Sequence, residues 1–281
     1  MSIIEKAPAK INLGLSIIGK SHHTYHDLEM VMVSIDLNDY ITVKEIDQGI
    51  IIDSNSTKVP LNKKNDIFKA ALLIKNHFNI SKGVHIFLEK NIPVCAGLGG
   101  GSSDAAATIR ALNQLWNLKM SKEQMYSFGF QIGSDVPFCL ESDCSYITGQ
   151  GEQVERLSKK VSSWVVLVKP SFGVSTRDIF KEVDYTTIRK IDIQSLKQAI
   201  LTNQYDQLLA TMGNSLEDIT IKKYPLIQKI KEKMLQSGAD IALMTGSGPT
   251  VFALCPNESR ANRVFNSMRG FCKEVYKVRM L

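Results

Sequence analysis

The chain of 281 residues is 44% hydrophobic and 22% charged, and 34 basic against 28 acidic residues leave a net charge of +6. This composition is ordinary for a globular enzyme and argues against a disordered chain. Lys and Arg are interleaved with Asp and Glu, which indicates a solvated surface with a mild preference for anionic small molecules rather than a face that binds nucleic acid.

The sequence also argues against a membrane or disulfide-bonded protein. No stretch approaches the ~18 consecutive apolar residues of a membrane span. Glu5, Lys6 and Lys10 interrupt the N-terminal segment where a signal peptide would be apolar. The five cysteines are scattered, with no CxxC pair and no His at zinc-ligand spacing. We therefore expect reduced thiols in a cytoplasmic protein.

The first half of the chain predicts strands followed by helices. β-rich runs at 41–46, 49–52 and 84–88 predict strands. Apolar periodicity predicts helices over 67–77, 104–116 and 122–130. Asn65 and Asp66 are suited to cap the first helix, whose apolar residues share one face: Ile67, Ala70, Ala71 and Ile74.

A polar segment around 152–163 predicts a boundary between a domain of residues 1–158 and a domain of residues 159–281. The second half then predicts, in order, strand 164–168, helices 195–201, 205–212 and 225–236, strands 241–244 and 251–254, helix 259–268 and strand 274–279. This order indicates a split βαβ, ferredoxin-like layer of helices on an antiparallel sheet, and the chain as a whole is expected to be α+β.

The strongest chemical signal is a glycine-rich loop between a predicted strand and a predicted helix. It reads Pro93, Val94, Cys95, Ala96, Gly97, Leu98, Gly99, Gly100, Gly101, Ser102, Ser103. Successive glycines let backbone N–H groups converge on an anion, and the helix that follows adds its positive dipole end. Phosphate oxygens are the natural guest, and the two serine hydroxyls could hold a phosphate oxygen or a metal-bound water.

Three better-known motifs do not fit this loop. A P-loop requires Gly-Lys-Ser/Thr, and no Lys follows these glycines. The dinucleotide fingerprint GxGxxG fails because Ser102 stands where its last Gly belongs. The nucleophile elbow GxSxG fails in the same way at Asp104.

Three further patterns are ambiguous when each is taken alone. Asp135, before Val136-Pro137, is placed like an ordinary turn or cap residue. Lys10 and Asn12 share one face of an otherwise apolar extended run, where a lysine could equally snorkel at the surface. The glycine-rich run at 244–250 lies between two predicted strands and fits a hairpin connection.

Together these segments resemble one family, the GHMP kinases. The resemblance runs from Ala7 to Leu254 and rests on the segments AKINLGL, YHDLEM, PVCAGLGGGSSDAA, GSDVPF, GQGE and TGSGPTVFAL. It implies an N-terminal domain like domain 2 of ribosomal protein S5 and a ferredoxin-like C-terminal domain. It further implies that ATP, expected with Mg²⁺, places its phosphates in the 93–103 loop and its adenine near Asn65.

The same resemblance implies the catalytic residues. Lys10 and Asp135 match the catalytic pair of the family, and Asn12 matches a residue that orients the acceptor. Phosphoryl transfer passes through a loose transition state, so positioning and charge neutralisation matter more than a strong nucleophile. Asp135 is then expected to accept the proton of the acceptor hydroxyl, and a nearby Lys10 to keep it ionised.

The resemblance also implies a small-molecule acceptor that carries a cytidine diphosphate group. Tyr25 and Phe180 match two rings that sandwich the cytosine, His26 matches the residue that reads its polar edge, and Thr176 belongs to the same pocket. Stacking accepts any flat base, so discrimination must come from hydrogen bonds such as that of His26. One departure concerns His23-Thr24, where the family has Asp-Gly.

Two alternatives stay open at this point. The chain could phosphorylate a different small hydroxylated acceptor, because the departure lies in the loop that carries Tyr25 and His26. It could also be a catalytically idle relative kept as a ligand-binding protein. Lys10, Asp135 and the glycine-rich loop, all present, argue against the idle reading.

Overall fold

The computed structural model describes residues 2–20, 26–159 and 161–281. The chain forms two compact units. Unit 1 comprises Met1–Ala9, Leu37–Val94 and Gly99–Ser142, and unit 2 comprises Lys10–Asp36, Cys95–Leu98 and Asp143–Leu281. The predicted domain boundary after residue 158 is a division along the sequence, and it stays a prediction.

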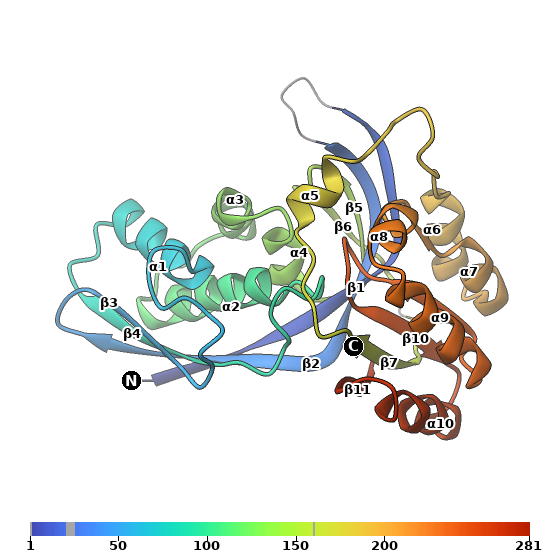
Figure 1. The fold of residues 1–281 in the computed structure, drawn as a ribbon. Helices are drawn as coiled ribbons and strands as arrows, with labels where there is room; N and C mark the ends of the chain where they lie inside the picture. The colour runs from blue at the N-terminus through green and yellow to red at the C-terminus, as the bar shows by residue number, and fades with distance from the viewer. Residues whose placement is uncertain (1, 21–25, 160) are drawn as a thin grey trace. The chain divides into compact units, whose positions relative to one another are not determined.

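Unit 1 is a sheet with helices packed on it (Figure 1). Strand β4 (Gly83–Glu89) lies between β3 (Ile50–Ser54), to which it is parallel, and the C-terminal part of β2 (His26–Ile46), to which it is antiparallel. The helices are α1 (Asp66–His77), α2 (Gly100–Leu115), α3 (Lys122–Ile132) and α4 (Val136–Glu141). Helix α2 packs against each of the other three.

Helix α1 illustrates how local sequence sets an element of unit 1. The side-chain oxygen of Asn65 accepts a hydrogen bond from the Ile67 N–H at 2.9 Å, so the predicted N-cap is confirmed. The predicted apolar face is confirmed as well, because Ile67, Ala70, Ala71 and Ile74 are all fully buried. Helix α1 packs against α2.

The sheet that contains β2, β3 and β4 also includes strands of unit 2. Strand β5 (Ser145–Gly149) pairs antiparallel with both β2 and β6 (Gln153–Arg156). Strand β1 (Ser2–Lys20) pairs in parallel with the short β8 (Gly213–Asn214). Residues 7–16 of β1 are buried without interruption, so the polar side chains in this stretch must find partners inside the protein.

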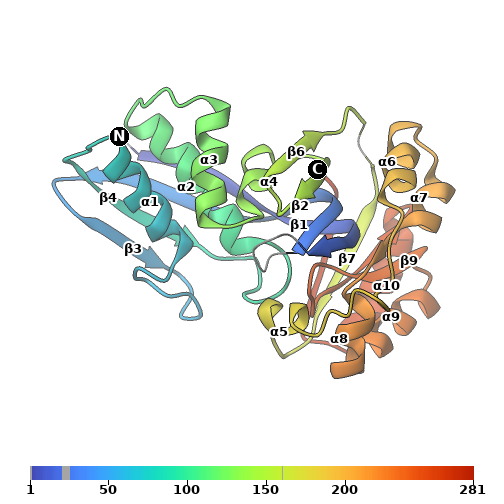
Figure 2. The same cartoon turned by 90° about the horizontal axis from the view of Figure 1, so that it is seen from above.

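The other sheet of unit 2 confirms the predicted ferredoxin-like arrangement. It has the strand order β11-β7-β10-β9 with antiparallel neighbours throughout. Its strands are β7 (Trp164–Lys169), β9 (Ile241–Met244), β10 (Val251–Cys255) and β11 (Glu274–Arg279). Helices α9 (Leu226–Gln236) and α10 (Glu258–Arg269) pack on this sheet (Figure 2). The remaining helices are α5 (Thr176–Phe180), α6 (Ile193–Leu201), α7 (Tyr205–Thr211) and α8 (Glu217–Lys223).

Two predictions about the elements need correction. Helix α2 begins at Gly100 rather than at about residue 104, so its first turn is made from the glycine-rich loop itself. The short extended runs expected near the N-terminus are parts of β1 and β2, strands of 19 and 21 residues. Within the described residues, no helix is both long enough and apolar enough to cross a bilayer.

Candidate functional site

The glycine-rich loop combines left-handed backbone with close packing. Cys95, Gly97 and Gly99 have φ values of +54°, +73° and +68°. Gly99 then acts as the N-cap of α2, and the residues from Gly100 to Ser103 form its first turn. The first N–H groups of a helix have no partner within the helix, so this turn presents donors suited to phosphate oxygens.

Gly97 has no room for a side chain. A Cβ at this position would lie 2.6 Å from the carbonyl oxygen of Thr245 and 3.0 Å from that of Gly248, both in unit 2. Its φ of +73° adds strain for any L side chain, about 1–2 kcal/mol. The loop is therefore held against the 245–250 turn by backbone approaches that only glycine permits.

We expect Gly97→Ala to weaken ATP binding by about tenfold or more, because the variant loop relieves its strain by leaving the conformation that binds phosphate, and restoring that conformation costs about 1–2 kcal/mol. Isothermal titration calorimetry with ATP on the folded variant measures the effect. Gly19→Ala is the matched control, since a Cβ there meets nothing within 4 Å. Unchanged ATP affinity in a folded Gly97→Ala variant would remove this loop from the nucleotide site.

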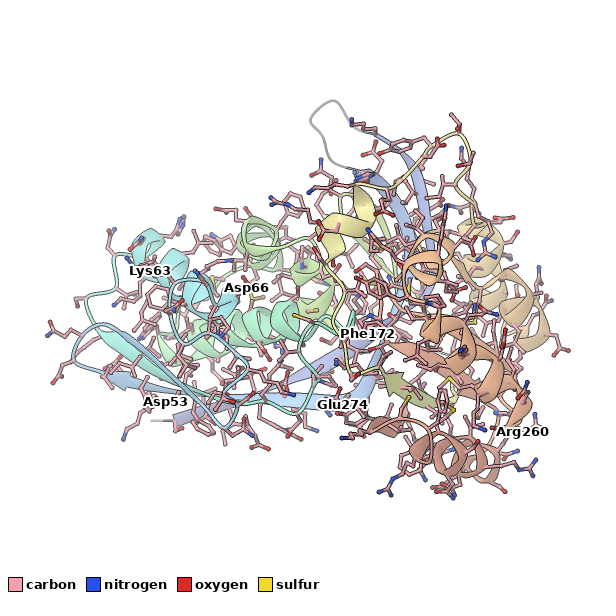
Figure 3. The ribbon with its side chains drawn as sticks, in the orientation of Figure 1. Asp53, Lys63, Asp66, Phe172, Arg260 and Glu274 are labelled. Carbon is pink, nitrogen blue, oxygen red and sulfur yellow. The ribbon has the colours of Figure 1, made fainter. Side chains whose placement is uncertain are left out.

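Within unit 1, the start of α2 lies beside the segment that leads to Asp135. A Cβ built at Gly133 would lie 4.0 Å from the Ser102 hydroxyl, and one built at Gly101 would lie 3.5 Å from Asp66 Oδ2. Asp66 is at the first turn of α1, where Figure 3 labels it. The Ser103 hydroxyl is buried and has no hydrogen-bond partner among the described residues. The Ser102 and Ser103 hydroxyls are polar groups that can contact ligand oxygens at the start of α2, whereas the Asp66 carboxylate can only accept hydrogen bonds or contact a cation.

Asp135 occupies the N-cap position of α4, as its neighbourhood predicts. Its side chain does not form the usual cap hydrogen bond, and its φ and ψ are −85° and −12°. The residues that follow it, Val136 and Pro137, are buried. The Asp135 carboxylate is half-buried and does not cap the helix with a side-chain hydrogen bond. Helix capping therefore does not explain why an Asp stands at this position.

Lys10 is a buried lysine, 4% exposed, which excludes the reading of a snorkelling surface side chain. Its Nζ donates a hydrogen bond to Asn12 Oδ1 at 2.8 Å. Asn12 is in turn held by Thr245: its backbone N–H donates to Thr245 Oγ1 at 3.1 Å, and Thr245 Oγ1 lies 3.3 Å from Asn12 Oδ1. The Lys10 N–H also donates to the Leu98 carbonyl at 3.0 Å. Unit 2 therefore brings together β1, the 95–98 part of the loop and the 245–250 turn.

A buried ionic cluster lies beneath the first turn of α2 in unit 1. Lys90 Nζ is 2.5 Å from Asp39 Oδ2 and 2.8 Å from Asp104 Oδ2, and all three side chains are almost fully buried. Asp39 also accepts from the backbone N–H groups of Asn91 and Ile92. We call Lys90, Asp39 and Asp104 the buried triad.

The buried triad explains the need for glycine at position 100. A Cβ at Gly100 would lie 2.9 Å from Lys90 Nζ and 3.1 Å from Ile92 Cγ2. Burial lowers the pKa of Lys90, but the charges of Asp104 and Asp39 outweigh it and leave that pKa raised. Burial raises the pKa of Asp104 well above its usual range, although Lys90 acts in the opposite direction. A side chain at position 100 would therefore disturb this charge cluster as well as the loop.

Three of the predicted base-reading residues, His26, Phe180 and Thr176, belong to unit 2. The rings of His26 and Phe180 have centroids 4.6 Å apart and are tilted by 44°. Tyr25, together with His23-Thr24, lies outside the described residues. Thr176 begins α5, and its hydroxyl is 2.8 Å from that of Ser247 in the 245–250 turn. The pKa of His26 is lowered by burial and by the positive charge of Lys20, so the ring favours its neutral form.

The chain resembles a set of known kinases over its whole length. Residues 65–142 match the family model of the GHMP kinases N terminal domain, and residues 186–274 match that of the GHMP kinases C terminal domain. A protein of Streptococcus mutans is 63% identical over 100% of both chains, and one of Streptococcus agalactiae is 62% identical over 100% of both. Both are provisionally named 4-diphosphocytidyl-2-C-methyl-D-erythritol kinase. The chain belongs to the GHMP kinase family.

Solved structures support the same family. The crystal structure of a 4-(cytidine 5'-diphospho)-2C-methyl-D-erythritol kinase has a TM-score of 0.85 at 27% identity and covers 99% of each chain. Homoserine kinase from Cytophaga hutchinsonii, with a TM-score of 0.80 at 21% identity over 98% of this chain and 94% of its own, shares the fold. ATP is the co-substrate that membership of this kinase family implies.

Two residues that contact predicted site residues, Thr245 and Tyr185, are not among the site residues predicted from the sequence. Thr245 links Asn12 to the glycine-rich loop. The sequence predicts its run to be a hairpin connection, which β9 and β10 do form, and the run is also one of the segments that resemble the family. Tyr185 contacts His26 from the segment after α5, where no periodicity marks it. Asn65, predicted beside the adenine, uses both ends of its amide within unit 1, capping α1 and donating to the Pro60 carbonyl.

Proposed function

We propose that this GHMP kinase transfers the γ-phosphate of ATP to the 2-hydroxyl of 4-diphosphocytidyl-2-C-methyl-D-erythritol, a step of the methylerythritol phosphate route to isoprenoids. The observation that carries the proposal is identity of about 62% over the full length to relatives named for this reaction. The structural likeness to an enzyme of the same name, at a TM-score of 0.85, supports it.

In this reaction Asp135 accepts the proton of the acceptor hydroxyl. Lys10 supplies positive charge, and Asn12 orients the acceptor. The burial of Lys10 and its hydrogen bond to Asn12 support these roles, because burying a charged amine is costly unless polar partners compensate for the lost water. Most of the rate enhancement comes from positioning and charge neutralisation, as is usual for phosphoryl transfer.

The phosphates of ATP bind at the loop from Pro93 to Ser103 and the first turn of α2. Mg²⁺ accompanies the nucleotide and neutralises charge on its phosphates. Within the described residues, no group of three or more His, Cys, Asp or Glu is placed to hold a metal ion. The hydroxyls of Ser102 and Ser103 are the protein groups we assign to it or to a phosphate oxygen, since that of Ser103 is buried without a partner among the described residues.

The acceptor presents its cytosine to Tyr25, His26, Phe180 and Thr176. The rings stack on the base, and His26 supplies the hydrogen bond that selects it. We place this reaction in the cytoplasm, because ATP and a diffusible nucleotide-linked polyol meet there. No nucleic acid or membrane takes part in this proposal.

A panel of acceptors tests the function. ATP consumption is measured with 4-diphosphocytidyl-2-C-methyl-D-erythritol, mevalonate, homoserine and galactose. We expect kcat/KM for the cytidyl acceptor to exceed the others by at least about 100-fold, because a site built to hydrogen-bond a group rejects ligands that lack it. Turnover of another acceptor alone would point to the alternative that the His23-Thr24 departure leaves open, and no ATP turnover at all would favour an idle relative.

A further inference from the structure

A hydrogen bond joins Tyr185 to His26 inside unit 2. The Tyr185 hydroxyl lies 2.6 Å from His26 Nδ1, and the two rings are nearly parallel, at 16°, with centroids 5.8 Å apart. Phe180 contacts the same imidazole, with centroids 4.6 Å apart. The His26 ring therefore has Nδ1 engaged in a hydrogen bond and two aromatic neighbours, Phe180 and Tyr185.

The proton in this hydrogen bond belongs to the phenol. A phenol is a far stronger acid than a neutral imidazole N–H, and an imidazole nitrogen is a far better acceptor than a phenol oxygen. Burial, together with the negative charge of Asp27, raises the pKa of Tyr185, so the phenol keeps its proton. Burial and Lys20 lower the pKa of His26, so its ring favours the neutral form that can accept.

We propose that Tyr185 is a positioning residue that donates its hydroxyl proton to His26 Nδ1 and so fixes the tautomer of His26 that carries hydrogen on Nε2. This inference rests on the proposed function, in which His26 reads the base of the acceptor. A neutral imidazole has one donor and one acceptor nitrogen, so a partner on one nitrogen decides what the other offers.

The fixed tautomer gives the site a preference among pyrimidines. His26 Nε2–H is a donor, and ring nitrogen N3 of cytosine is an acceptor. Uracil carries N–H at the same position and would set donor against donor, which leaves a polar group without its partner. Tyr185 thus favours cytidine over uridine without touching the base itself.

The test is NMR of the full chain, labelled with ¹⁵N in its imidazole rings, without substrate. The His26 signals are assigned by their loss in His26→Gln. We expect an unprotonated Nδ1 and a protonated Nε2 in the native protein at pH 8. In Tyr185→Phe we expect the Nδ1 signal to shift toward a mixture of tautomers and the pKa of His26 to rise, because the neutral ring loses a hydrogen bond that stabilises it.

Tyr146→Phe is the matched control. Tyr146 also donates its hydroxyl proton to a side chain of unit 2, that of Glu29 at 2.7 Å, and the second partner of this hydroxyl is Gln194 rather than His26. This variant should leave the His26 signals unchanged. A native Nδ1 that carries hydrogen would overturn the inference, as would a Tyr185→Phe variant with unaltered His26 signals and pKa.

Kinetics give the second readout. Tyr185→Phe should raise KM for the cytidyl acceptor about 3- to 10-fold, the range of one hydrogen bond, with kcat and the KM for ATP within about twofold. Neutral His26 is lost as the pH falls through its pKa, so the acidic limb of kcat/KM should move to higher pH in the variant. An unchanged acceptor KM and pH profile in an active enzyme would overturn the role of Tyr185 in reading the base.

If the native enzyme does not phosphorylate the cytidyl acceptor, the proposed function fails. The NMR result still decides whether Tyr185 sets the tautomer of His26.

Discussion

Asp135→Asn should lower the turnover number at least about 100-fold while leaving the dissociation constant for ATP within about twofold. The amide has the size of the carboxylate but cannot accept the proton of the acceptor hydroxyl. Asp135 is not the side-chain cap of α4, so the substitution costs no cap hydrogen bond. Single-turnover kinetics and ATP titration of the same preparation measure the two quantities.

The matched control for Asp135→Asn is Asp47→Asn, which changes an exposed carboxylate of unit 1 whose ion pair with Lys82 is 3.7 Å long. This variant should behave as the native enzyme, since exposed pairs contribute little. Should Asp135→Asn lose ATP binding in proportion to turnover, its role would be in binding the nucleotide. Native turnover in the variant would remove Asp135 from the chemistry altogether.

Lys90→Met should lower the free energy of unfolding by about 3–5 kcal/mol, the usual cost of removing one partner of a buried ion pair. The methionine fills much of the space of the lysine stem, but it leaves Asp39 and Asp104 facing one another without a cation. Urea denaturation at pH 8 measures the loss. Because Lys90 packs under Gly100, we also expect weaker ATP binding in the folded fraction.

The pH dependence identifies the cause of this loss. Without Lys90, burial and the charge of Asp39 raise the pKa of Asp104 in the folded state still further above its unfolded value of about 4. The folded variant then binds more protons than the unfolded chain, so its stability falls as pH rises through that window and recovers on acidification. Lys82→Met, which breaks an exposed pair, should cost less than about 1 kcal/mol at either pH. A loss below about 1 kcal/mol in Lys90→Met would show that the buried triad contributes no more to stability than an exposed ion pair.

Some elements of the fold could be predicted from local sequence signals. The cap and apolar face of α1 follow from residues close together in the chain. The ferredoxin-like arrangement was predicted from the order of strands and helices, although β7 pairs with β10, which lies far from it in the chain. The start of α2 could not be predicted in this way, because glycine is a poor helix former in the interior of a helix. At a first turn that penalty matters less, since those N–H groups lack helical partners anyway and phosphate can use them.

The buried triad and the Tyr185 hydrogen bond could not be predicted in this way. Lys90 and Asp39 are 51 positions apart, and Tyr185 and His26 are 159 positions apart. Nothing in the sequence around any of them signals burial or a shared partner. Such contacts come from tertiary packing, whereas Lys10, Asn12 and Asp135 were found because each lies in a segment that resembles the family.

The way the chain is shared between the two units limits how the protein can be divided. Unit 2 takes Lys10–Asp36 and Cys95–Leu98 from the first half of the sequence, and β8 in the second half pairs with Gly14 and Leu15 of β1. A fragment beginning at residue 159 would therefore lack strands on which its own packing depends. Neither half of the gene, expressed alone, should give a compact product, and tags or fusion partners belong at the chain ends rather than at the middle.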